Sequence, residues 1–135
     1  MLSKQKTTAE AEVEVSENAP VISAGEENSG FANLAASLAE IRKLKGVCGY
    51  ILRSDTSAIV DLSEQDKIIE YAILSSQIAE SSREIAKQFN MADIESVLVE
   101  GKSVKVLCMS VGENKIGVFM DKTATHDWII KRILL

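Results

Sequence analysis

The residues that could carry out chemistry are few in this chain of 135 residues. The segment VEGKS, residues 99–103, matches the end of the phosphate-binding P-loop pattern G-x-x-x-x-G-K-[ST]. The first glycine of that pattern is replaced by Ser96, and a P-loop must open a helix whose N-terminus holds the phosphates. Because apolar strand patterns flank residues 99–103 on both sides, we expect a hairpin turn there and no phosphate site.

Metal and thiol chemistry are not predicted either. His126 is the only histidine, and the two cysteines, Cys48 and Cys108, lie far from it and do not form a C-x-x-C pair. Both cysteines lie in predicted strands among apolar neighbours, where a thiol packs as a small hydrophobic group. Lys105 would lie on the opposite face of its strand from Cys108, so it cannot activate that thiol. Since no nucleophile elbow, HExxH motif or calcium loop is present, we predict a protein that is not an enzyme and holds no cofactor or metal.

The charge distribution argues against two classes of partner. Residues 1–30 carry 2 lysines and 6 glutamates, a balance of −4, and the other 105 residues carry 13 basic and 14 acidic side chains, a balance of −1. Nucleic-acid binding needs a basic stripe that neutralises phosphates. Anionic membrane surfaces attract polybasic segments. We therefore predict neither a nucleic-acid partner nor a membrane partner.

Cysteine content and hydropathy indicate the compartment. Two cysteines are too few for a secreted disulfide framework. The first ten residues, MLSKQKTTAE, lack the apolar stretch of a signal peptide. No uncharged apolar run approaches the ~20 residues that a membrane helix needs. We expect a cytoplasmic protein.

The chain divides into a tail and one domain. Residues 1–30 have low hydrophobicity, excess negative charge and the only proline, and they are predicted to be a disordered acidic tail. The alternation in AEVEVSE is also compatible with a strand, but glutamate at every other position favours an unattached tail. Residues 31–135 are predicted to form the domain, which is long enough to bury one core.

Hydrophobic periodicity predicts helices and strands throughout that domain. Apolar residues at spacings of three and four predict helices, and short apolar runs separated by turn residues predict strands. Ser63 and Asp66 form a possible capping box for the long helix, and Asn90 is a left-handed stop after it. The strands are apolar on both faces, so both faces of the sheet need helices. The predicted elements are helices at 31–45, 64–89 and from Thr123 or Thr125 onward, and strands at 47–53, 58–62, 94–100, 104–111 and 115–121.

The long helix carries the most informative surface. Ile69 and Ile73 lie one turn apart on a flank, roughly 100° to 140° from the centre of the face expected to pack on the sheet. Ser76 and Glu80 continue this flank, and small residues nearby would let another backbone approach. We interpret the flank as a helix-to-helix dimer contact; a broadened core face is the alternative. The expected core face comprises Ile68, Tyr71, Ala72, Ser75, Ile78, Ala79, Ser82, Ala86 and Phe89.

The domain resembles the roadblock/dynein light chain family. The resemblance covers residues 31–135 and rests on FANLAASLAEIRKLKGVCGYILRSD, on the long helix rich in small residues, and on FNMADIESVLVEGKSVKVLCMSVGENKIGVFMDKTA. It includes the Gly-Val-x-Gly start of the first strand at Gly46, Val47 and Gly49. One departure is that the turn after the first strand, residues 53–57, has no glycine.

The resemblance implies the fold class. It is a three-layer α/β (α+β) domain with a five-stranded antiparallel sheet in the order 2-1-5-4-3. The long helix covers one face and the other two helices cover the opposite face. In this order the fifth strand separates Cys48 from Cys108, so their Cα atoms should be at least about 9.6 Å apart, too far for a disulfide.

The resemblance also implies a homodimer that binds and regulates or scaffolds a Ras-like small GTPase. The third strand would pair with its counterpart in a second copy, and the long helices would lie side by side. A structural light-chain-type subunit of a larger complex and a small-ligand sensor domain are the alternatives. The predicted dimer interface comprises Ile69, Ile73, Ser76, Glu80, Ser96 and Leu98, and the predicted partner-binding residues are Glu70, Gln77, Glu80 and Glu84.

Overall fold

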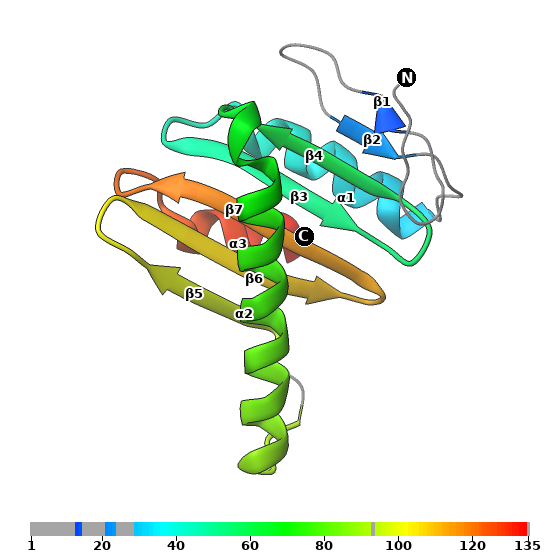
Figure 1. Cartoon of the computed structure of the whole chain (residues 1–135), viewed down its shortest axis with the longest axis vertical. Coiled ribbons are helices and arrows are strands. Elements are labelled where there is room, and N and C mark those ends of the chain that lie inside the picture. The colour runs from blue at the N-terminus through cyan, green and yellow to red at the C-terminus, as the bar shows by residue number, and fades with distance from the viewer. Residues whose placement is uncertain (1–12, 15–20, 24–28, 93, 135) are drawn as a thin grey trace.

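The computed structural model describes residues 13–14, 21–23, 29–92 and 94–134. Their elements form one antiparallel sheet with helices on both faces (Figure 1). The sheet order is β1-β2-β4-β3-β7-β6-β5. The strands are β1 (Val13–Glu14), β2 (Val21–Ser23), β3 (Val47–Arg53), β4 (Ala58–Leu62), β5 (Ser96–Glu100), β6 (Val104–Val111) and β7 (Asn114–Asp121), and the helices are α1 (Ser29–Ile41), the short 3-10 helix η1 (Gln65–Lys67), α2 (Ile68–Gln88) and α3 (His126–Leu134).

The five predicted strands occur in the predicted order, since β4-β3-β7-β6-β5 corresponds to 2-1-5-4-3. Short turns make β5, β6 and β7 an antiparallel meander. The segment VEGKS joins β5 to β6 through a tight turn in which Gly101 N donates to Val104 O at 2.8 Å. The prediction of a hairpin turn at this place is therefore confirmed.

Two strands lie within the segment predicted to be a tail. β1 pairs with β2, and β2 pairs with β4 in the register Ile22↔Ile59. This pairing was not predicted, because alternating glutamates are also typical of a solvated acidic segment. The prediction of disorder for the rest of residues 1–28 lies outside the described residues.

The larger part of the core lies between the sheet and the α1/α3 layer. Phe31 and Leu38 of α1 and Ile129 of α3 are almost fully buried against Leu52 and Val118 of the sheet. The spacing of the α1 residues at three and four positions produces this buried stripe, as predicted. Further members are Leu34, Ile41, Tyr50, Leu107, Met109, Ile116, Met120 and Ile133.

Among the described elements, the helix that covers the opposite face of the sheet is α2. Tyr71 stacks on Phe119 with ring centroids 4.5 Å apart and an interplanar angle of 12°. Gly117 lets α2 approach, because a Cβ at that position would lie only 3.3 Å from Ser75 Cβ. Leu74 and Ile78 also pack on this cluster, although only Ala86 of α2 is fully buried. The helix is therefore held on the sheet by one modest apolar layer.

Two expectations about α2 were wrong. Ser63 does not cap the helix: its hydroxyl donates to Cys48 O at 2.9 Å, and no side chain caps η1 or α2. Phe89 was placed on the core face but is 71% exposed. The C-terminal end of α2 runs past the edge of the sheet (Figure 1), and Phe89 directly follows that end, so none of the described strands lies beneath it. Asn90 does stop the helix, with a φ of 56°.

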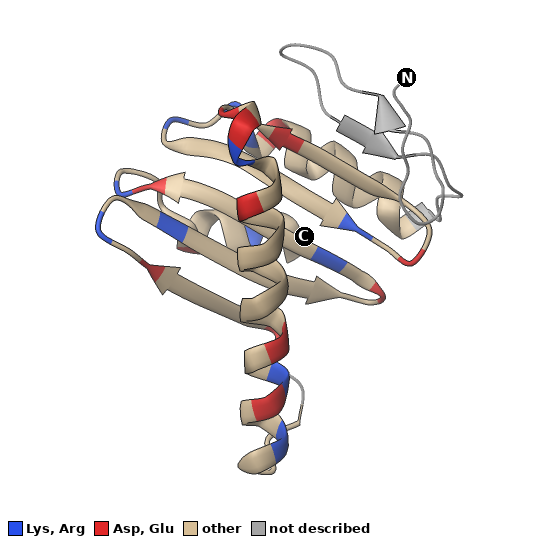
Figure 2. Cartoon of the chain, in the orientation of Figure 1, with Lys and Arg blue, Asp and Glu red and all other residues tan. Residues whose placement is uncertain are grey.

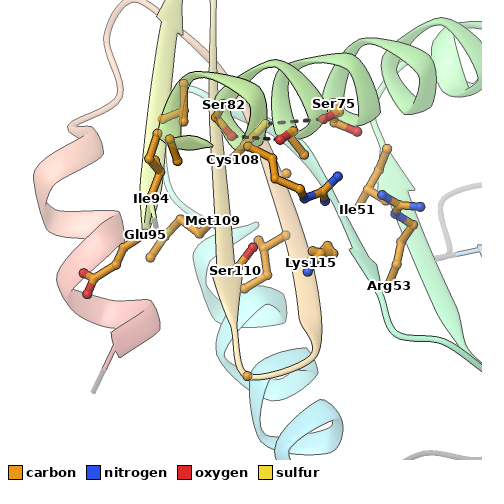
Figure 3. A pocket seen from close by; sticks show the side chains of 17 residues that line it. Ile51, Arg53, Ser75, Ser82, Ile94, Glu95, Cys108, Met109, Ser110 and Lys115 are labelled. Atoms are coloured by element: carbon orange, nitrogen blue, oxygen red, sulfur yellow. Dashed lines mark hydrogen bonds between the residues drawn. The ribbon is translucent and has the colours of Figure 1, made fainter. Parts of the chain in front are cut away.

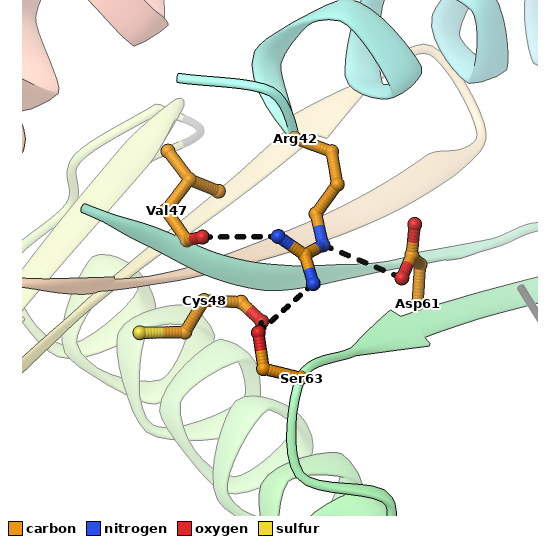
Figure 4. A network of polar contacts seen from close by, with 5 residues as sticks. All are labelled: Arg42, Val47, Cys48, Asp61 and Ser63. Carbon is orange, nitrogen blue, oxygen red and sulfur yellow. Dashed lines mark hydrogen bonds and ion pairs between the residues drawn. The ribbon is translucent and has the colours of Figure 1, made fainter. Parts of the chain in front are cut away.

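The end of α1 is tied to the sheet by Arg42 (Figure 4). Its Nε lies 3.3 Å from Asp61 Oδ1, Nη1 donates to Val47 O at 3.2 Å, and Nη2 donates to Ser63 Oγ at 2.9 Å. One guanidinium group thus joins the α1 end to β3, to β4 and to the segment after β4.

Replacing Arg42 by alanine is expected to lower the free energy of unfolding by about 1–2 kcal/mol, because hydrogen bonds to three partners are lost and two of them are partly buried. Lys43→Ala is the matched control, since its ion pair with Glu40 at 3.6 Å is solvent-exposed and should contribute at most ~0.5 kcal/mol. Urea unfolding followed by circular dichroism measures both. Equal stability of the two variants would show that the Arg42 contacts do not hold the layers together.

Candidate functional site

The α2 helix and the β5 edge contain most of the residues predicted to form an interface. Ile69 is 74% exposed and Ile73 is 53% exposed, so the alternative of a broadened core face does not hold within this chain. Ser76 is half-buried, whereas Glu80 and Ser96 are exposed. Leu98 differs from these residues because its side chain packs against the core on the α1/α3 side of the sheet.

The predicted partner-binding residues lie on the outer surface of α2. Glu70, Gln77, Glu80 and Glu84 are all exposed. Glu70 lies 3.9 Å from Lys67 Nζ, a contact that water screens. Figure 2 shows that charges occur at both ends of α2, whereas its middle, residues 71–79, carries none. The long helix therefore offers an uncharged central surface with residues of both charges on either side.

The end of α2 forms an apolar overhang, defined here as residues 85–91. Ile85 is 48% exposed, Phe89 71% and Met91 52%. Three large apolar side chains in water over seven residues are unusual in a monomeric domain. The sequence pattern did not reveal this feature, because the helix wheel shows which residues share a face but not where the supporting sheet ends.

The neighbouring strand is a bare sheet edge. β5 pairs with β6 on one side and with no strand on its other side within the described part of the chain. Its residues Val97, Leu98 and Val99 are apolar, and Val99 is 40% exposed. An apolar edge strand of this kind is a template for pairing with another chain. The opposite edge of the five-stranded core differs, because β2 covers β4 there.

The two flanks of α2 face different surroundings. Leu74, Ile78, Ser81 and Ile85 recur at spacings of four, three and four, and form one stripe, here called the seam stripe. Leu74 and Ile78 pack on the sheet beside Val104, and Ile85 continues the stripe past the sheet edge. Ile73 lies five residues from Ile78, about 140° around the helix. One neighbouring helix therefore cannot cover Ile73 and the seam stripe together.

In the part of the chain that the structure describes, the cysteines and the histidine are not brought together. Burial raises the pKa of the Cys108 thiol to about 11, and burial followed by the Asp121 charge raises the pKa of Cys48. Raised pKa values keep both thiols protonated and weakly nucleophilic. His126 begins α3, where its Nδ1 lies 3.4 Å from Lys105 Nζ on the face opposite Cys108. Among the described residues no group of three or more His, Cys, Asp or Glu side chains could hold a metal ion, and no described helix is long and apolar enough to cross a membrane.

Comparison of the chain with known proteins identifies its fold. No protein-family profile matches the sequence, and no curated protein matches it significantly. Solved structures do match: a Roadblock/LC7 domain from Streptomyces avermitilis has a TM-score of 0.60 at 15% identity, covering 81% of this chain and 89% of that one. The gliding protein MglB from Thermus thermophilus has a TM-score of 0.62 at 15% identity, covering 80% of this chain and 85% of that one.

The chain has the roadblock/LC7 fold. The family resemblance predicted from the sequence is thereby confirmed for the fold, including the five-stranded core, its order and the placement of the helices. In this roadblock fold the overhang and the bare β5 edge lie next to one another, and both are apolar. The predicted dimer interface and partner-binding residues stay predictions.

Proposed function

We propose that this roadblock-type chain is a non-catalytic homodimeric adaptor that binds and regulates or scaffolds a Ras-like small GTPase in the cytoplasm. The main support for the dimer is the overhang at the end of α2. Three apolar side chains extend past β5, at the point where the sheet of a second copy would continue if two β5 strands paired antiparallel. Such pairing would place the partner's sheet beneath the overhang.

A two-fold dimer uses the same surface on both copies. The β5 residues Ser96 and Leu98, predicted to lie in the interface, belong to the pairing strand. The seam stripe is the flank of α2 that faces the second helix in this arrangement, because its members continue from the sheet onto the overhang. Ile69 and Ile73 then stay exposed on the outer surface. We therefore reassign them from the dimer contact to the partner-binding surface, beside Glu70, Gln77 and Glu84.

The GTPase part of the proposal rests on the family resemblance and on this outer surface. This surface combines two exposed isoleucines with acidic and amide side chains. In a two-fold dimer each copy contributes one such surface beside the paired α2 helices. An apolar centre with a polar rim is the usual anatomy of a protein interface. The near neutrality of residues 31–135 gives no basic stripe for nucleic acid or for a membrane surface.

The test is affinity purification with the full chain as bait from lysate of its source cell, loaded with either a non-hydrolysable GTP analogue or GDP. A Ras-like small GTPase should be enriched about tenfold in one nucleotide state over the other. Ile69→Glu with Ile73→Glu should abolish that enrichment while leaving the bait dimeric. Capture that is independent of nucleotide would favour a structural subunit, and the absence of any small GTPase would contradict the proposal.

A further inference from the structure

A hollow of about 500 Å³ lies beside α2, on the flank opposite the seam stripe (Figure 3). Its floor is the part of the sheet that α2 leaves uncovered. Ile51 and Cys108 face this side of the sheet, and residues two positions further along a strand share its face. Arg53, Lys115 and Ser110 therefore face the hollow from β3, β7 and β6, and they line it together with Arg83 of α2.

The strand register places two cations side by side on this floor. Arg53 lies directly opposite Lys115 in the β3–β7 pairing, and Lys115 lies opposite Ser110 in the β6–β7 pairing. Like charges directly opposite one another on neighbouring strands are unfavourable. Such a pair is expected where an anion offsets the repulsion between the two cations. Functional sites often contain groups of this kind, which lower the stability of the fold.

No group of the described chain supplies that compensation. The ion pairs among the described residues join other side chains: Arg42–Asp61, Lys43–Glu40, Lys67–Glu70 and His126–Asp127. One acidic residue, Glu95, lines the hollow against the three cations Arg53, Arg83 and Lys115. Three positive charges and one negative leave the hollow with a charge of +2, within a chain whose net charge is −5.

From this geometry we propose that the hollow is a binding site for a small phosphate ester. A phosphate dianion matches the charge of the hollow, and guanidinium groups bind phosphate through paired N–H donors. Ser110 adds a hydroxyl next to Lys115. Ile51 and Val97 provide apolar surface for the organic part of the ligand, and the volume falls within the usual range for small-molecule sites. Val97 of β5 also lines the hollow, so the site borders the proposed dimer edge, but AMP binding does not depend on the proposed function.

Isothermal titration calorimetry with the full chain tests the site, using AMP as the probe and adenosine as its uncharged counterpart. AMP should bind, and adenosine should bind at least about tenfold more weakly because charge-assisted hydrogen bonds are missing. Arg53→Gln and Lys115→Gln should each weaken AMP binding by about tenfold to a hundredfold. Glu95→Gln should strengthen it about threefold, since a repelling carboxylate is removed. Lys102→Gln, in the turn between β5 and β6, is the matched control and should bind as the unaltered chain does.

Thermal unfolding of the same variants separates binding from folding. Without AMP, Arg53→Gln and Lys115→Gln should have a Tm equal to or above that of the unaltered chain, because each removes the like-charge neighbour. With AMP, the unaltered chain, Lys102→Gln and Glu95→Gln should gain Tm, whereas Arg53→Gln and Lys115→Gln should gain little. The proposal is wrong if AMP does not bind, if adenosine binds equally well, or if Arg53→Gln and Lys115→Gln keep full affinity for AMP. A hollow that instead receives an acidic side chain of a protein partner would not bind AMP.

Discussion

Replacing Ile85 and Phe89 together by glutamate is expected to convert the dimer into a folded monomer. Both side chains are largely exposed in the single chain, so their replacement removes little from its own core. In the proposed dimer they pack on the partner's sheet, where each buried apolar side chain contributes about 1.5–3 kcal/mol. Because each substitution is present in both copies of the dimer, the dissociation constant of the dimer should rise by at least about a thousandfold. Light scattering after size exclusion measures the mass, and circular dichroism confirms the fold.

Ala32→Glu with Ala36→Glu is the matched control for this variant. It adds the same two negative charges at exposed helical positions of α1, on the opposite face of the sheet from α2, and should remain dimeric. Ile69→Glu with Ile73→Glu should also remain dimeric, because these residues lie on the outer surface in the proposed arrangement. If the Ile69/Ile73 variant becomes monomeric and the Ile85/Phe89 variant does not, the dimer contact is the flank first predicted from the sequence.

Replacing Gly49 by alanine is expected to cost about 3–5 kcal/mol or to prevent folding. A Cβ at this position would lie 2.3 Å from Asp61 O and 2.7 Å from Leu62 Cα, and both of these are backbone atoms of β4 that cannot move aside alone. The register between β3 and β7 also shifts between Val47 and Gly49. The glycine therefore allows β3 to bend while it stays paired on both sides.

Gly112→Asn provides the control for Gly49→Ala. Gly112 has a φ of 61°, which asparagine tolerates better than other residues, and a Cβ there would meet nothing within 4 Å. Its free energy of unfolding should fall by no more than about 1 kcal/mol. Urea unfolding compares the two variants. A Gly49→Ala chain as stable as Gly112→Asn would show that β3 and β4 can separate without loss, contrary to the close packing described above.

Much of the fold could be predicted from the sequence, because it depends on local patterns. Spacings of three and four predicted α1 with Phe31 and Leu38 buried, and turn residues predicted the hairpins. The Gly-Val-x-Gly segment was part of the family resemblance, and the structure supplies its physical reason. At Gly46 the φ is 90° and a Cβ would lie 2.7 Å from Asp121 Oδ1. Both glycines of the segment are thus required by close approach.

The candidate sites could be predicted only in part, because they depend on distances between elements. The periodicity of α2 indicated an unexplained apolar flank at Ile69 and Ile73, and the structure leaves both exposed. The overhang was missed because the helix outruns the sheet by a length that no local pattern encodes. The hollow was missed because the pairing of Arg53 with Lys115 joins residues 62 positions apart. In the sequence alone, nothing near Arg53 distinguishes it from Arg42, Arg83 or Arg132.

In the proposed function this chain forms a dimer through α2 and β5, and the joint surface of the two copies binds a partner. The most direct test is the solution mass of the unaltered full chain by light scattering after size exclusion. We expect a dimer with twice the chain mass of 14.7 kDa, which is 29.4 kDa. A mass of 14.7 kDa at concentrations well above micromolar would contradict it, because the apolar overhang and the bare edge would then be stable in water without a second copy.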